Sequence, residues 1–160
     1  MEAGTDLGIR AFGVEAQRLL RLEKGHIIIG QDTDGLTTPL EGALEWAVRM
    51  DKPFFVGQRS LRIIEKQVRR HKLAGFALDK GFSGEAPKEC HLVIRNGDIA
   101  GRVTSIAFSE SVGQHVGLAF VAPELAQEGT RFNIRADGGR MVEAKVVKTP
   151  FYDPSAERQR

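Results

Sequence analysis

Cysteine and histidine are scarce in this chain of 160 residues. Cys90 is the one cysteine, so the chain can form neither an internal disulfide nor a cysteine-based metal cluster. The four histidines are scattered, and no two share metal-ligand spacing on an expected helix. His91 follows Cys90, but neighbours on a strand point to opposite faces. We therefore predict no metal site and no cysteine–histidine catalytic pair.

Long apolar runs and a strong net charge are absent as well. No stretch approaches the length of a membrane span, and residues 1–6 lack the basic start and apolar core of a secretory signal. The net charge of +2 is too small to indicate nucleic acid by itself. The basic run at residues 66–72 is typical of a solvated helix end. We expect a cytoplasmic or otherwise reducing location, without membrane or nucleic-acid partners.

Residues 38–48 have a full set of helix-start signals. Thr38 can act as N-cap, Pro39 suits the first helical position, and Glu41 stands where a capping box needs its carboxylate. Apolar residues then recur at helical spacing, which predicts a helix with one buried stripe. Trp46 lies off the centre of that stripe. Its ring either covers another part of the protein or offers a surface on which a ligand can stack.

Two further helices and one short strand are expected in the first part of the chain. Residues 14–24 and 58–70 carry apolar side chains at helical spacing. Residues 26–29 form a β-branched run between turn signals, which predicts a strand. An isolated strand leaves its backbone groups unpaired. Residues 1–70 therefore either pack onto the rest of the chain or end a larger domain, and we predict self-association or partial disorder there.

The loop after residue 30 resembles the front of a calcium-binding loop, with Asp32, Asp34 and Gly35 in sequence. A calcium loop of that type needs another oxygen ligand two residues beyond Asp34, and Leu36 stands there. We therefore reject calcium. The aspartates are better suited to turns that lead into the Thr38 cap.

From residue 71 onward the segments are short, β-rich and separated by turns. Asn96 and Gly97 form the strongest hairpin signal. Strands at such even spacing predict an antiparallel barrel or sandwich. The expected strands are residues 72–78, 91–94, 101–109, 116–121, 130–136 and 141–148. The sequence thus predicts an α+β fold with two parts, residues 1–70 and residues 71–160.

Five stretches together resemble the glycine cleavage T-protein family, the tetrahydrofolate-dependent aminomethyltransferases. They read LRLEKG at 20–25, TPLEGALEW at 38–46, FVGQR at 55–59, GRVTS at 101–105 and VGLAFV at 116–121. The resemblance covers nearly the whole chain. It implies that residues 1–70 end a folate-binding domain and that residues 71–160 form a C-terminal antiparallel β-barrel.

Within this family the sequence is most similar to the folate-binding region of the sarcosine oxidase α subunit. Residues 7–10, 12–18 and 25–35 carry this narrower resemblance. Such an enzyme yields 5,10-methylenetetrahydrofolate, while flavin and NAD bind elsewhere in the complex. In this family the catalytic aspartate and the acidic residue that binds the pterin ring both precede the matched region. The resemblance therefore implies a fragment that is inactive alone and whose partners are folate and other subunits or the missing N-terminal portion. The alternative is a non-catalytic structural or subunit-docking module.

The resemblance also suggests which residues face folate. Trp46 matches the tryptophan of the family's folate pocket. Gln17 stands where T-proteins carry an arginine toward the folate glutamate tail, so the charge-assisted hydrogen bond is lost there. Arg18 or Arg21 could replace that arginine, or could form ordinary ion pairs on the helix. Arg158 in the tail is a looser match, and no catalytic residue is assigned.

Overall fold

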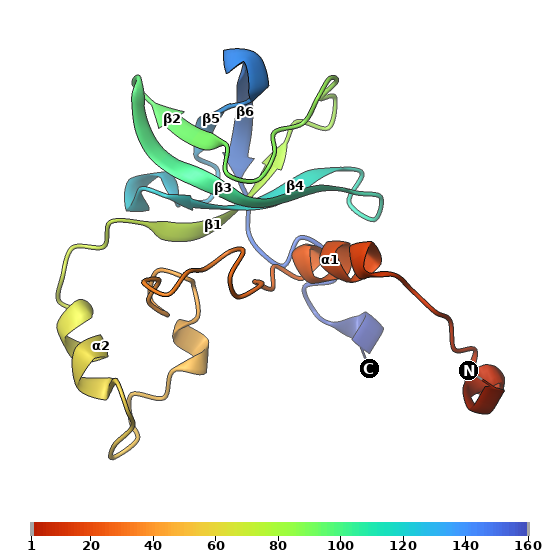
Figure 1. Ribbon diagram of the computed structural model, residues 1–160, viewed down its shortest axis with the longest axis horizontal. Coiled ribbons are helices and arrows are strands. Elements are labelled where there is room, and N and C mark those ends of the chain that lie inside the picture. Colours follow the sequence, from red (N-terminus) through yellow and green to blue (C-terminus); the bar gives the residue numbers. More distant parts are fainter. Residues whose placement is uncertain (1, 160) are drawn as a thin grey trace.

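Six antiparallel strands form a closed barrel in the computed structural model, which describes residues 2–159. The strands are β1 (Lys72–Leu78), β2 (Leu92–Arg95), β3 (Asp98–Ser109), β4 (Gln114–Val121), β5 (Arg131–Arg135) and β6 (Met141–Val146). They pair in the order β1-β4-β3-β2-β5-β6, and β6 returns to β1 (Figure 1). The fold is α+β with a C-terminal antiparallel barrel, as predicted.

The residue pattern along the strands explains the barrel. β5 and β6 bury every second residue, as strands do when one face meets a core and the other meets water. Apolar side chains fill the interior, where the rings of Phe76 and Phe132 meet edge to face at 5.7 Å. Asn96 and Gly97, both with positive φ, make the turn between β2 and β3, which confirms the predicted hairpin.

Helix α1 (Val14–Glu23) covers one outer face of the barrel, and the prediction of a helix at 14–24 is confirmed. Leu22 of this helix packs in a second apolar cluster with Leu73 of β1 and Leu118 of β4. Because both faces of β4 are covered, its residues from Val116 onward are buried without alternation. Of the two alternatives for the first part of the chain, α1 therefore follows the first, packing onto the barrel.

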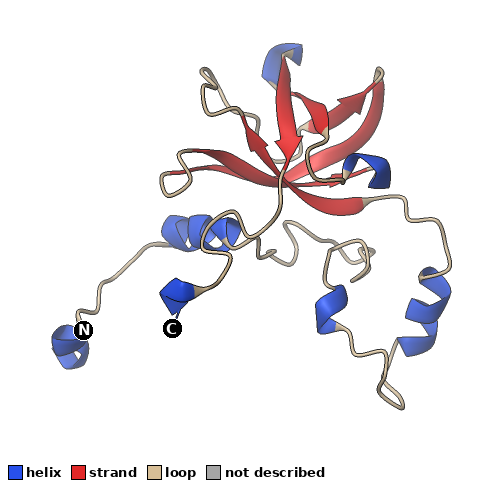
Figure 2. Ribbon diagram, turned by 180° about the vertical axis from the view of Figure 1, so that it is seen from behind, coloured by secondary structure: helices blue, strands red, loops and turns tan. Residues whose placement is uncertain are grey.

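The other helical elements are short. They are α2 (Gln58–Ile64) and the 3₁₀ helices η1 (Glu2–Leu7), η2 (Glu45–Ala47), η3 (Pro123–Leu125), η4 (Asp137–Gly139) and η5 (Glu157–Gln159). Helix α2 lies away from the barrel in both views (Figures 1 and 2). It ends well before the predicted residue 70. The amides of Lys66 and Gln67 donate to carbonyls three residues back, and Val68 is 95% exposed, so no apolar contact extends the helix.

The predicted helix at residues 38–48 is wrong. The capping box does form, since the Thr38 amide donates to Glu41 Oε2 at 3.1 Å and the Glu41 amide donates to Thr38 Oγ1 at 3.3 Å. The Glu41 carbonyl, however, accepts a hydrogen bond from the Leu73 amide of β1 at 2.8 Å. That carbonyl is thus taken by the barrel, Ala43 turns to a positive φ, and only η2 is helical.

The predicted strand at residues 26–29 is wrong as well. Its only β-type pairing among the described residues is an isolated bridge between Ile29 and Thr33. Asp32 draws this segment into a turn, because its amide donates to the Ile28 carbonyl at 2.9 Å and its side chain accepts from the Ile28 amide at 2.8 Å. The division into domains at residue 70 and the self-association of residues 1–70 stay predictions.

Candidate ligand-binding pockets

A buried carboxylate holds the first part of the chain against the barrel. Asp32 is fully buried and accepts hydrogen bonds from Arg21 Nη1 at 2.5 Å, Ser105 Oγ at 2.5 Å, Thr104 Oγ1 at 2.6 Å and the Ile28 amide. Arg21 Nη2 also donates to Ser105 Oγ at 2.8 Å. Four donors on one buried carboxylate satisfy the rule that buried charges are paired and hydrogen-bonded. This cluster therefore fixes the turn at residues 28–32 onto β3.

A second set of contacts ties the C-terminal tail to the end of α1. The amides of Phe151 and Tyr152 donate to the Glu23 carbonyl at 2.9 and 3.0 Å. Lys24 Nζ donates to the Asp153 carboxylate at 3.0 Å, and this hydrogen bond holds the pKa of the Asp153 carboxyl below its ordinary value. The tail is thus anchored through its backbone and one ion pair.

Trp46 is 79% exposed and lines a pocket of about 550 Å³. The pocket is lined by Trp46 of η2, by the segment at residues 24–27 that follows α1, and by strand β1. Gly42, Leu73, Gly75 and Leu118 contribute to its wall. No carboxylate is among the described residues that line this pocket.

The four predicted site residues are distributed over different elements. Trp46 lies in η2, Gln17 is exposed on α1, and Arg158 is exposed in η5. Figures 1 and 2 show η2 apart from α1 and from the C-terminal end of the chain. Arg21 points inward instead, with Nη1 and Nη2 bonded to Asp32 and Ser105. Its geometry gives it a structural role beneath the barrel.

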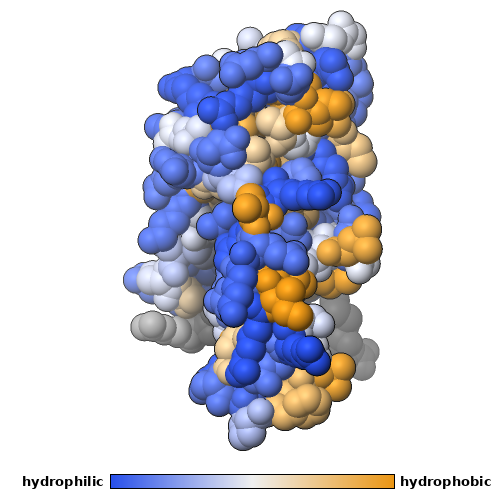
Figure 3. All heavy atoms as spheres, turned by 90° about the vertical axis from the view of Figure 1, so that its left-hand side faces the viewer, coloured by the Kyte–Doolittle hydropathy of each residue, from blue (hydrophilic) through white to orange (hydrophobic). Residues whose placement is uncertain are grey.

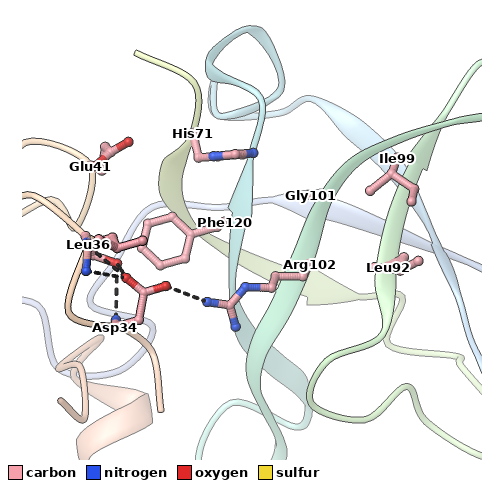
Figure 4. A pocket seen from close by; sticks show the side chains of 10 residues that line it. Asp34, Leu36, Glu41, His71, Leu92, Ile99, Gly101, Arg102 and Phe120 are labelled. Carbon is pink, nitrogen blue, oxygen red and sulfur yellow. Dashed lines mark hydrogen bonds and ion pairs between the residues drawn. The ribbon is translucent and has the colours of Figure 1, made fainter. Parts of the chain in front are cut away.

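A second pocket, of about 340 Å³, lies between the loop at residues 34–41 and the outer face of the barrel (Figure 4). Asp34 and Arg102 face each other in it at 3.9 Å, and the Phe120 ring lies beside them. The sequence predicted only a turn for Asp34 and only a place in the GRVTS motif for Arg102. Nothing local in the sequence brings these two residues together, because β3 and the loop meet only in the folded chain.

Both ring nitrogens of His91, just before β2, contact neighbouring residues. His91 Nδ1 accepts from the Lys88 amide at 3.0 Å, and Nε2 lies 3.1 Å from Asp137 Oδ1. Lys88 Nζ also donates to Asp137 at 2.8 Å, which lowers the pKa of the Asp137 carboxyl and raises that of the Lys88 ammonium. Because both ring nitrogens are engaged, His91 is not free to act as a base toward Cys90.

Two features are absent among residues 2–159, a metal-binding cluster and a membrane-spanning helix. No cluster of three or more His, Cys, Asp or Glu side chains is arranged to hold a metal ion in this part of the chain. Within the same described range, the helices are all too short or too polar to cross a membrane.

The fold and its pockets define an antiparallel barrel protein with a helical segment anchored on it. Residues 71–153 match the glycine cleavage T-protein C-terminal barrel domain, and residues 1–52 match the GCVT N-terminal domain. The first match alone covers more than half of the chain. The chain therefore belongs to the glycine cleavage T-protein family.

Known relatives agree with this assignment. The chain is similar to an aminomethyltransferase of Halothermothrix orenii, with 38% identity over 151 residues, and to a probable aminomethyltransferase of Pyrococcus horikoshii, with 34% identity over 163 residues. These alignments cover 94% and 96% of this chain, but only 41% and 40% of the relatives. The chain thus spans about two fifths of the length of the curated relatives it matches.

A solved structure shares the fold. The crystal structure of glycine cleavage system aminomethyltransferase T from Bartonella henselae superposes with a TM-score of 0.80 at 27% sequence identity. The superposition covers 92% of this chain and 41% of that one.

Proposed function

We propose that this chain is the C-terminal part of a tetrahydrofolate-dependent aminomethyltransferase-type domain of the sarcosine oxidase α-subunit kind. It contributes one wall of a folate site that yields 5,10-methylenetetrahydrofolate. Membership of the T-protein family supports the folate chemistry. The sequence of residues 7–10, 12–18 and 25–35 supports the narrower assignment to the sarcosine oxidase α-subunit kind. Flavin and NAD would bind elsewhere in the complex, which we place in the cytoplasm.

The observation that carries this proposal is the open indole of Trp46 at the mouth of a pocket. An exposed aromatic ring beside Gly42 and the apolar residues of β1 suits a flat heteroaromatic ligand that stacks on it. The described lining has no carboxylate to read a pterin ring by hydrogen bonds. The chain's residues therefore supply a stacking surface, and the acidic groups come from the preceding part of the enzyme.

The other candidate residues take different parts in the proposal. Gln17 and Arg158 are exposed and would approach the glutamate tail of the folate, with Arg158 providing the charge that Gln17 lacks. Arg21 is a positioning residue that acts through Asp32 to hold the pocket-forming segment on the barrel. Without the upstream acids, the chain alone would bind and orient but would not catalyse.

Fluorescence and calorimetric titration with 5-formyltetrahydrofolate test this function. Trp46 is the only tryptophan, so the intrinsic emission reports on this one site. We expect weak binding to the 160 residues and at least tenfold tighter binding to a chain extended upstream. Trp46→Ala should weaken binding to the extended chain about tenfold, the order of one lost stacking contact.

Phe54→Ala is the matched control, since Phe54 is 78% exposed in the same region but does not line the pocket. Equal affinity of the Trp46→Ala and Phe54→Ala chains would refute the assigned role of Trp46. Formation of 5,10-methylenetetrahydrofolate by the 160 residues alone would refute the claim of inactivity.

A second candidate function is subunit docking. Phe54, Val56 and Val68 expose 78%, 93% and 95% of their surfaces. Figure 3 shows hydrophobic patches between hydrophilic ones on one side of the molecule. Single exposed apolar side chains are common, but several in one short region are suited to a partner subunit. Specific capture of a partner by a chain that binds no folate would favour this function over the first.

A further inference from the structure

The pocket between the loop and the barrel shares no lining residue with the Trp46 pocket. Its loop side carries Asp34 and Glu41, and its barrel side carries Arg102 and Phe120. The hydrogen bond from the Leu73 amide to the Glu41 carbonyl holds the loop on β1. At Gly101, a Cβ would collide with the Phe120 carbonyl, so glycine lets β3 lie close to β4 and places Arg102 beside the ring. The pocket is thus formed by tertiary contacts that fix its walls.

Each carboxylate in this pocket has one oxygen engaged and one left over. Asp34 Oδ1 accepts from the amides of Leu36 and Thr37 and from Thr37 Oγ1, at 2.8–2.9 Å. The Thr37 hydroxyl thereby keeps the pKa of the Asp34 carboxyl below its ordinary value, so that carboxylate is charged at neutral pH. Glu41 Oε2 accepts from the Thr38 amide and hydroxyl. Among the described residues, no hydrogen bond reaches Asp34 Oδ2 or Glu41 Oε1.

The Arg102 guanidinium opposite these carboxylates also has hydrogen-bonding capacity to spare. The Arg102 side chain is 39% exposed, and its Nη2 stands 3.9 Å from Asp34 Oδ2, too far for a hydrogen bond. Its guanidinium lies 6.0 Å from the centre of the Phe120 ring, at the limit of a cation–π contact. Figure 4 shows the guanidinium directed toward Asp34 beside that ring. Donors and acceptors therefore face the same space across a gap.

The rest of the pocket is mostly apolar, with His71 and Thr37 as its other polar residues. Leu36 is 90% exposed and Ile99 is 66% exposed, although both line a concave surface. Apolar side chains left open in a pocket gain when a ligand covers them. A ligand here needs an acceptor for Arg102, a donor for Asp34 and an apolar group for Leu36 and Phe120.

We propose that this pocket binds a free α-amino acid with a large apolar side chain. The carboxylate of the ligand accepts from Arg102, its ammonium donates to Asp34 Oδ2, and its side chain lies against Phe120 and Leu36. The zwitterion adds no net charge to a site that already holds two carboxylates and one guanidinium, and its ammonium faces the side that carries the carboxylates. The apolar contact distinguishes this ligand from glycine, which has no side chain to cover the pocket wall. This site is independent of the proposed folate function.

Calorimetric titration of the 160-residue chain with L-phenylalanine tests the proposal. We expect saturable binding to one site. Removal of either charge should weaken binding at least about fivefold, so 3-phenylpropanoate and 2-phenylethylamine serve as probes that lack the ammonium and the carboxylate. Glycine and D-phenylalanine should also bind more weakly, because they lose the apolar contact or its direction.

Two variants assign the binding to this pocket. Arg102→Gln should weaken binding about tenfold and Asp34→Asn about fivefold. Arg95→Gln is the control, since Arg95 is also an exposed barrel arginine paired with a carboxylate, here Glu124 at 3.0 Å. Thermal melting of each variant checks that it is folded.

Absence of saturable binding up to about 20 mM L-phenylalanine, a concentration far beyond that of specific recognition, overturns the proposal. Equal affinity for 3-phenylpropanoate overturns it too, because the ammonium would then not be recognised. If Arg102→Gln and Arg95→Gln lower the affinity for L-phenylalanine equally, the ligand binds elsewhere and the proposal is overturned. None of these outcomes depends on folate binding at Trp46.

Discussion

The barrel and the first 70 residues are stabilised in different ways. Every strand of the barrel has two hydrogen-bonded neighbours, and a continuous apolar core fills its interior. Residues 2–70 reach the barrel through α1, through the Asp32 cluster and through single bonds such as that from Leu73 to Glu41. A closed barrel leaves no strand edge unpaired, whereas the helical part depends on the apolar contacts of α1 and on a few polar contacts.

The largest loss should follow from opening the barrel core. Phe76 is fully buried and packs against Phe132. We expect Phe76→Ala to lower the free energy of unfolding by about 3–5 kcal/mol, because it creates a cavity where the chain cannot collapse. Denaturant unfolding measures this, with Phe54→Ala as the exposed aromatic control. A loss below about 1 kcal/mol would mean that the barrel is loosely packed.

Breaking the Asp32 cluster should cost nearly as much but act on one region. Asp32→Ala leaves Arg21 without its buried partner, which typically costs about 3–5 kcal/mol. Amide hydrogen exchange should rise across residues 14–35 while β5 and β6 stay protected. Asp51→Ala removes an exposed carboxylate as a control. Uniform loss of protection over the whole chain would show that the two regions unfold as one.

Acid should release the tail before the barrel. Because the pKa of the Asp153 carboxyl is lowered in the folded chain, its pairing with Lys24 stabilises fully above the unfolded value of about 3.9. That contribution is lost as the pH falls below this value and through the folded pKa. The protection of the amides in residues 151–157, measured against the intrinsic exchange rate at each pH, should therefore fall below about pH 4. In Asp153→Asn the same protection should be lowered already at pH 6, and an unchanged profile would contradict the pairing.

The smallest effect on stability is expected at Trp46. Its side chain is exposed, so Trp46→Ala should change the free energy of unfolding by no more than about 0.5 kcal/mol. Thermal melting of the Trp46→Ala and Phe76→Ala chains, measured side by side, compares the loss at an exposed ring with the loss at a buried one. A loss above about 2 kcal/mol would mean that the ring packs within the protein and is not free for a ligand.

The strands and α1 could be predicted because their signals are local and agree with the fold. Alternation in β5 and β6, the Asn96–Gly97 turn and the apolar side of α1 each favour one structure. The folate-related residues came from a family resemblance, and their roles stay proposals. The pocket of Asp34 and Arg102 was missed, since residues far apart in the chain meet there.

Local pattern by itself determined the β-rich second half, its turns and the first helix, since strand alternation and helix amphipathicity are properties of neighbouring residues. The tertiary structure decided the environment of Trp46 and Arg21. The Leu73 amide took the Glu41 carbonyl that a helix at 38–48 required, and the buried Asp32 carboxylate drew Arg21 inward. At Glu41 the hydrogen bond from the barrel outweighed helix propensity, whereas at Arg21 the helix formed and the buried contacts with Asp32 and Ser105 set only the direction of the side chain.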